Sequence, residues 1–120
     1  MNLLNLDDEK FKTVNVKGYQ FKIRFETPLD TISIGQWRRK LQNGDPVELM
    51  TQDEFNLCNA VAICDTCIDE YPKGFSLNES SIRWDDEELI LMVALEIKKH
   101  TDDVKAKLKK NKPDIGGEGK

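Results

Sequence analysis

The sequence predicts an α+β fold: an N-terminal β-hairpin packed on a mainly α-helical domain of three main helices, the last one long and basic. Two observations lead to this prediction. Apolar residues alternate with polar ones near the N-terminus and then recur at helical spacing in three later segments. Segments containing Pro, Gly or Asn separate these patterns from one another.

The length of 120 residues fits one domain. We expect residues 1–10 to form an N-terminal arm and residues 11–112 to form a single α+β domain. Residues 113–120 are rich in Pro and Gly and contain few apolar groups, so we expect a disordered tail there.

The expected hairpin spans residues 11–26. Its second strand alternates four aromatic or branched side chains with polar ones: Tyr19, Phe21, Ile23 and Phe25. Lys17-Gly18 supplies the turn, since glycine readily adopts positive φ. A two-stranded hairpin alone is marginal in water. We therefore expect Phe21 and Phe25 to pack on the helices or on a second subunit.

The first expected helix spans about residues 28–43. Thr27, Pro28 and Asp30 resemble a helix start, and Asn43-Gly44 marks the end. We expect four side chains to face inward: Leu29, Ile32, Trp37 and Leu41.

The second expected helix spans about residues 51–70. Thr51 and Glu54 have the spacing of a capping box, and Pro72 with Gly74 forms the following corner. Its apolar stripe includes Phe55, Cys58, Val61, Ala62 and Ile68. Small side chains on this helix would let another helix approach closely: Ala60, Ala62 and Thr66.

The third expected helix spans about residues 85–110. It begins in a run of acids, which the positive end of the helix dipole favours: Asp85, Asp86, Glu87 and Glu88. Its apolar stripe is Ile90, Val93, Ile97, His100, Val104 and Leu108. A helix of this length spans about 39 Å, more than a domain this small can cover. We therefore expect its lysine-rich last turns to project.

The charge of the chain is uneven. Residues 1–97 hold 18 acids against 10 bases, whereas residues 98–112 hold seven lysines against two aspartates. The lysines are not interleaved with aromatic residues, so we do not expect a nucleic-acid partner. The chain has no apolar run long enough for a membrane span and no signal-peptide pattern, so we expect no membrane association and a cytoplasmic location.

The three cysteines, Cys58, Cys64 and Cys67, fall in the second expected helix. Cys64 and Cys67 have C-x-x-C spacing, which leaves a zinc site and a redox pair open. A zinc site needs four ligands, however, and the chain offers only His100 besides the cysteines. A redox pair also prefers a helix N-terminus. We therefore favour three packing residues, with no metal and no cofactor.

No phosphate-binding glycine loop and no Ser/His/Asp set occurs in the sequence, so we expect no catalytic residues and no enzyme activity. The "WRRK" segment is most simply an amphipathic helix end. Alternatively, this segment binds a partner protein, because Trp and Arg side chains are enriched among the residues that contribute most to binding energy at interfaces. His100 is better explained as a packing residue than as a ligand or base. Our candidate partner-binding residues are Trp37, Arg38, Arg39, Leu41, Ile97, His100, Val104 and Leu108.

The order of four motifs resembles a group of small proteins encoded with the tail genes of bacteriophages and prophages, the tail assembly chaperones. These motifs are "FKIRFETPLD", "WRRKLQNG", "LMTQDEFNLCNAVAICDTCIDEYPKGF" and "DEELILMVALEI". The resemblance covers roughly residues 19–97. The "SLNESSI" insert and the lysine-rich end depart from the group, which leaves open how the end of the chain binds a partner.

The resemblance implies a non-enzymatic protein that binds the helical tape-measure protein or a tail tube component in the host cytoplasm. Such a chaperone keeps its partner soluble until the tube assembles, and it is absent from the virion. One alternative is a structural phage component, a tail-completion or head–tail joining protein that acts as a subunit of a ring. Another is a small regulator that binds nucleic acid through its lysines. Homo-oligomers are compatible with each.

Overall fold

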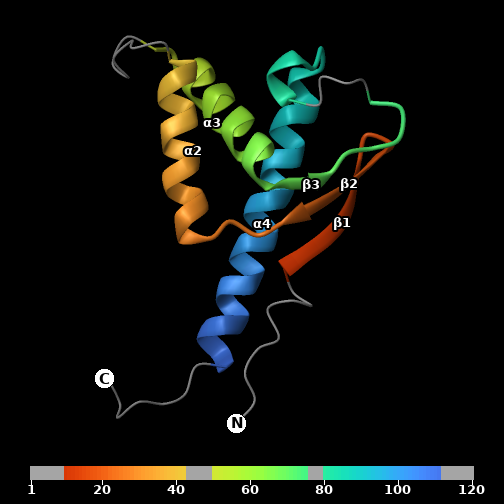
Figure 1. The fold of residues 1–120 in the computed structure, drawn as a ribbon, viewed down its shortest axis with the longest axis vertical. Helices are drawn as coiled ribbons and strands as arrows, with labels where there is room; N and C mark the ends of the chain where they lie inside the picture. The colour runs from red at the N-terminus through yellow and green to blue at the C-terminus, as the bar shows by residue number, and fades with distance from the viewer. Residues whose placement is uncertain (1–9, 43–49, 76–79, 112–120) are drawn as a thin grey trace.

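A computed structural model describes residues 10–42, 50–75 and 80–111 of the protein. The element order is β1 (Phe11–Val16), β2 (Tyr19–Arg24), α2 (Pro28–Leu41), α3 (Gln52–Cys67), β3 (Ile68–Glu70), η2 (Ser81–Arg83) and α4 (Glu87–Asn111) (Figure 1). The α+β class, with an N-terminal hairpin and three main helices, is therefore confirmed. The predictions for residues 1–9 and 113–120, and for the helix end at Asn43-Gly44, lie outside the described residues.

The hairpin forms as the sequence predicts. Strands β1 and β2 pair antiparallel, from Phe11 opposite Arg24 to Val16 opposite Tyr19. Lys17 and Gly18 have φ of 51° and 86° and connect the strands as a two-residue turn. Phe21 is completely buried. The prediction that this aromatic face packs on the helices is confirmed for Phe21.

A third strand corrects the predicted end of the second helix. Helix α3 ends at Cys67, not near residue 70, because Ile68 is extended with φ −83° and ψ 121°. Strand β3 then pairs antiparallel with β2, with Ile68 opposite Ile23, so the sheet order is β1-β2-β3. Ile68 is β-branched and buried, which suits a strand. The pairing also gives the central strand β2 a second neighbour, which a hairpin alone would lack.

The predicted start of α2 is confirmed, but its inward face is partly wrong. Thr27 and Asp30 form a capping box, and Thr51 and Glu54 form another at α3. The side chains of Leu29 and Ile32, however, are 71% and 59% exposed. Two other α2 residues are buried: Asp30 and Ile34.

The rotation of α2 follows from an ion pair. Asp30 accepts hydrogen bonds from Arg24, at the end of β2, which draws the Asp30 side of the helix inward. Trp37 and Leu41 lie further along the helix on the same side as Asp30, so they also face inward. Both pack against the core, as predicted. Leu29 and Ile32 lie on the opposite side and face outward.

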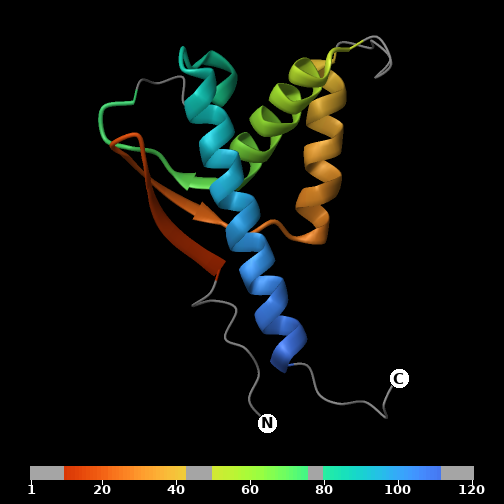
Figure 2. The ribbon, with the colours of Figure 1, turned by 180° about the vertical axis from the view of Figure 1, so that it is seen from behind.

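Helix α3 lies between the other two helices and contacts both α2 and α4. Its Ala60 and Ala62 side chains are buried, as expected for a helix that is approached closely. Helix α4 runs across the back of Figure 1 and across the front of Figure 2. Residues 105–109 of α4 are exposed, which confirms that its last turns project.

Candidate partner-binding surfaces

Trp37 fastens α2 to α3. Its indole Nε1 donates a hydrogen bond of 2.9 Å to the carboxylate of Asp65 in α3. Asp65 also accepts hydrogen bonds from the Ser80 hydroxyl at 2.9 Å and from the Ser81 backbone N–H at 2.8 Å. One carboxylate therefore joins three segments that lie far apart in the sequence. Trp37 is half-buried and has a structural role besides any contact with a partner.

An open groove lies beside Trp37. We call it the Trp37 groove; it has a volume of about 500 Å³ and is lined by Ser33, Trp37, Asp65, Thr66, Tyr71 and Ser80. Leu29 stands one helical turn before Ser33 on α2 and is not among the residues that line the groove. The groove offers aromatic side chains and several hydrogen-bonding groups. These features suit a polypeptide partner.

The outward side of α2 forms a second feature, which we call the α2 outer face: Leu29, Ile32, Gln36 and Arg39. These four residues are spaced by three, four and three positions, so they lie on one side of the helix. All four are exposed. Leu29 and Ile32 are the two most exposed large hydrophobic side chains of the described residues. This face was missed in the sequence, because both residues were expected to face inward.

The other predicted residues of α2 are less accessible. The Arg38 guanidinium lies 5.2 Å from the centre of the Phe55 ring and links α2 to the start of α3 by a cation–π contact. Leu41 is half-buried against the core. Among Trp37, Arg38, Arg39 and Leu41, only Arg39 is fully on the surface.

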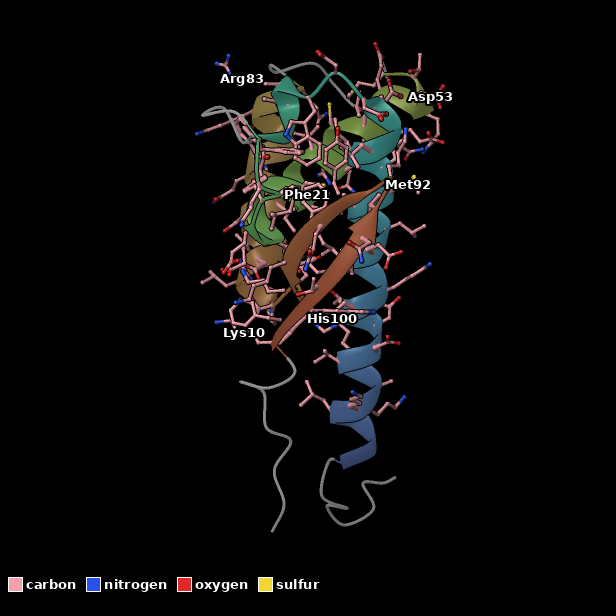
Figure 3. All side chains as sticks on the ribbon, turned by 90° about the vertical axis from the view of Figure 1, so that its right-hand side faces the viewer. Lys10, Phe21, Asp53, Arg83, Met92 and His100 are labelled. Carbon is pink, nitrogen blue, oxygen red and sulfur yellow. The ribbon has the colours of Figure 1, made fainter. Side chains whose placement is uncertain are left out.

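Three predicted residues of α4 are buried, which corrects the expectation that they lie on an exposed part of the helix. Ile97, His100 and Val104 are 0%, 6% and 1% exposed. They are enclosed by this chain because their side of α4 faces β1, β2 and the segment after β2 (Figure 3). Leu108, further along, is 39% exposed and lies beyond this contact.

His100 is a packing residue, as expected. Its Nε2 lies 3.2 Å from the backbone carbonyl oxygen of Lys10, to which it donates a hydrogen bond. The same carbonyl accepts a hydrogen bond from the Phe25 backbone N–H at 3.2 Å. The Phe25 ring stands edge-on to the imidazole at 6.3 Å. His100 thus anchors the open end of the hairpin to α4.

The opposite side of α4 carries an apolar surface that the sequence analysis did not identify. We call it the α4 outer stripe: Leu91, Met92 and Leu95, which are 39%, 39% and 53% exposed. Met92 points away from the sheet and the other helices in Figure 3. Leu95 follows Met92 by three positions and Leu91 by four, a pattern visible in the sequence once the buried stripe of α4 is set aside.

Aromatic side chains gather where the hairpin meets the start of α4. The rings of Tyr19, Phe21 and Trp84 each stand 5.3–5.7 Å from the Phe75 ring in edge-on contact. At the rim, Lys17 Nζ donates hydrogen bonds to Asp86 at 2.6 Å and to Glu88 at 2.9 Å. The cluster joins segments distant in the sequence and closes the turn of the hairpin against α4.

Cys64 and Cys67, the C-x-x-C pair, lie in the core, whereas Cys58 is half-buried. Cys64 and Cys67 are completely buried, and the Cys64 thiol donates a hydrogen bond of 3.4 Å to the Ile90 carbonyl. Burial raises the pKa of the Cys64 thiol strongly, and burial raises that of Cys67 to about 12. Across residues 10–42, 50–75 and 80–111, no group of three His, Cys, Asp or Glu side chains could hold a metal ion.

Comparison of the chain with protein-family models, with characterised proteins and with solved structures finds no match. Of the described helices, none is long and apolar enough to cross a membrane.

Proposed function

We propose that this protein is a phage tail assembly chaperone that binds helical segments of the tape-measure protein and keeps them soluble in the host cytoplasm. The observation that carries the proposal is the exposure of Leu29 and Ile32 on the outward side of α2. The resemblance of residues 19–97 to small tail-gene proteins supports the choice of partner.

The chemistry of the α2 outer face suits a helical partner. Leu29 and Ile32 would cover apolar side chains on a partner helix, which recur at the same spacing of three and four residues. Gln36 and Arg39 continue the face with polar groups, so the contact area is apolar at one end and polar at the other. Such a surface masks an aggregation-prone stripe without requiring a large buried interface.

Weak binding at each copy is compatible with this role. Several copies along one long chain give avidity even when each contact is weak, and each copy still leaves readily during assembly. The exposed apolar area on α2 is small, which agrees with a contact of modest individual affinity.

Co-expression tests the proposal. The tape-measure protein of the same gene cluster is produced with the wild-type chain, with Leu29→Asp/Ile32→Asp, or with Ile82→Asp. Ile82 is a matched control because its side chain is also apolar, is 48% exposed and lies in η2, outside the α2 outer face. We expect the wild type and the control to raise the soluble yield of the partner and the double variant to fail. Circular dichroism should be the same for all three proteins.

Trp37→Ala is a poorer probe of this surface, because loss of the Trp37–Asp65 hydrogen bond also loosens α2 from α3. The chaperone proposal fails if the tape-measure protein is equally soluble without this chain, or if the double variant works as well as the wild type.

A structural phage component is the second candidate, and one observation favours it. Strand β1 pairs only with β2 among the described residues, so it is an edge strand onto which a neighbouring subunit could add a strand in a ring. A ring component remains in purified particles at fixed stoichiometry, whereas a chaperone does not. Mass spectrometry of purified particles therefore separates the two candidates.

A further inference from the structure

We propose that two copies of this chain associate through the α4 outer stripe, with the two α4 helices packed antiparallel about a twofold axis. The proposal concerns the chain by itself and does not depend on the chaperone function. It is tested on the purified protein alone.

The first support is the exposure of three apolar side chains on one side of one helix. Leu91, Met92 and Leu95 point away from the core, and Leu95 is 53% exposed. In Figure 2, α4 lies in front of the sheet and of the other two helices, so none of these elements covers its outer side. The stripe has the spacing through which two helices pack side by side.

The second support is the charge on either side of the stripe. Glu87 and Glu88 stand one turn before it, and Lys98 and Lys99 stand one turn after it; all four are exposed. When two α4 helices pack antiparallel about Met92 and Leu95, Glu88 of each copy faces the lysine pair of the other. A parallel pair would instead place acid against acid and lysine against lysine. The antiparallel orientation therefore brings these four charges against opposite ones, and the parallel orientation does not.

These charged groups remain available to a second copy. Glu88 is an ion-pair partner of Lys17 at 2.9 Å, but its side chain is 71% exposed. Lys99 lies 3.7 Å from Glu96 within the same helix and is 60% exposed. Both contacts lie on the surface. Glu88 and Lys99 can therefore each contact a side chain of opposite charge in a second copy as well.

The size of the stripe indicates a weak dimer. Three side chains cover less area than the roughly 800 Å² per partner of a standard stable interface. The flanking charges therefore matter for orientation, and the association should weaken as salt rises. A dimer of this kind is visible at high protein concentration and low ionic strength.

Sedimentation equilibrium at about 100 µM protein and low salt tests the association. We expect the wild type to be largely dimeric. Leu95→Asp should lower the association constant about 100-fold, because the dimer would bury two unpaired carboxylates. Leu29→Asp is the matched control, since it places the same charge on an exposed position of α2 and should leave the dimer intact. A monomeric wild type, or a dimeric Leu95→Asp variant, overturns the proposal.

Charge reversal tests the antiparallel arrangement. Glu88→Lys alone and Lys98→Glu/Lys99→Glu alone should each weaken self-association. An equal mixture of the two variants should form dimers again, because each acid then faces a lysine of the other chain. If Glu88→Lys dimerises as well as the wild type, or if the mixture does not recover, the antiparallel arrangement is wrong.

Discussion

Arg24 and Asp30 form the ion pair that joins the sheet to the helices. The Arg24 guanidinium donates hydrogen bonds to both carboxylate oxygens of Asp30, one of them at 2.9 Å. It also donates a hydrogen bond of 2.8 Å to the Thr66 carbonyl near the end of α3. Asp30 is only 8% exposed. One guanidinium thus ties β2 to α2 and α3 and sets the side of α2 that faces the core.

Asp30→Asn should lower the free energy of unfolding by about 2 kcal/mol at neutral pH. Burial tends to raise the pKa of Asp30, but the hydrogen bonds from Arg24 and Thr27 outweigh it and hold that pKa at about 2, below the ordinary 3.8. Because the folded-state pKa is the lower one, the stabilisation is present above about pH 4 and is lost as the pH falls toward 2. Urea denaturation at neutral pH and near pH 2 measures both effects.

The difference between wild type and Asp30→Asn should therefore shrink in acid. Asp103→Asn is the control, because Asp103 is exposed on α4 and should change stability little at either pH. An Asp30→Asn variant as stable as the wild type at neutral pH would show that the ion pair does not contribute to folding.

The same Gly→Ala substitution should have opposite effects at two positions. Gly18 has φ of 86° in the hairpin turn, so alanine there is strained although no atom lies within 4 Å of the added Cβ. We expect a loss of about 1 kcal/mol of unfolding free energy. Gly35 lies inside α2, where alanine should stabilise the helix by up to about 1 kcal/mol. Thermal denaturation of both variants measures the two signs.

The gain at Gly35 depends on one contact. The added Cβ would meet an Arg39 guanidinium nitrogen at 3.4 Å, the end of a flexible and exposed side chain that can move aside. A destabilised Gly35→Ala variant would mean that the helix needs this close approach. A stabilised Gly18→Ala variant would contradict the turn geometry.

Thiol reactivity should divide the cysteines into two classes. Cys64 and Cys67 are completely buried and their pKa values are raised, so neither forms the reactive thiolate in the folded protein. Cys58 is half-buried, and its pKa is also raised, by burial and by Glu54. With a disulfide reagent at mildly alkaline pH, we expect one slow thiol in the native protein and all three after unfolding.

Cys58→Ala should remove the reactive thiol of the native protein. Cys64→Ala and Cys67→Ala should keep it and should each lower the free energy of unfolding by about 1 kcal/mol, through small cavities. Rapid reaction of Cys64 or Cys67 in the folded protein would contradict the buried arrangement and reopen a redox function for the pair.

Local rules in the sequence accounted for the element types and for several boundaries. The capping box predicted at Thr51 and the helix start predicted near residue 28 are both correct, because a cap bonds groups only three positions apart. The hairpin turn is correct because Lys17-Gly18 separates two strands by the two residues that such a turn uses. The long α4 is correct because its buried stripe persists from Ile90 to Val104.

The candidate site was predictable only in part. Arg39 and Leu108 are exposed, but Ile97, His100 and Val104 of the same predicted set are buried. The periodicity of α4 identified an apolar side, and nothing local indicates whether that side faces this chain or another one. The α4 outer stripe was hidden for the same reason, since a helix with two apolar sides has two possible inward faces.

The sequence by itself determined the hairpin and the three main helices, because hydrogen bonds within a turn or a helix join residues only a few positions apart. The tertiary structure alone decided the end of α3 at Cys67, the third strand at Ile68 and the rotation of α2. The third strand depends on pairing with Ile23 of β2, which lies far away in the sequence. The arrangement of the helices depends on Arg24, which bonds Asp30 of α2 and Thr66 of α3. Leu29 and Ile32 face solvent because the rotation of α2 keeps Asp30 paired with Arg24. A buried, unpaired carboxylate costs more free energy than two exposed aliphatic side chains.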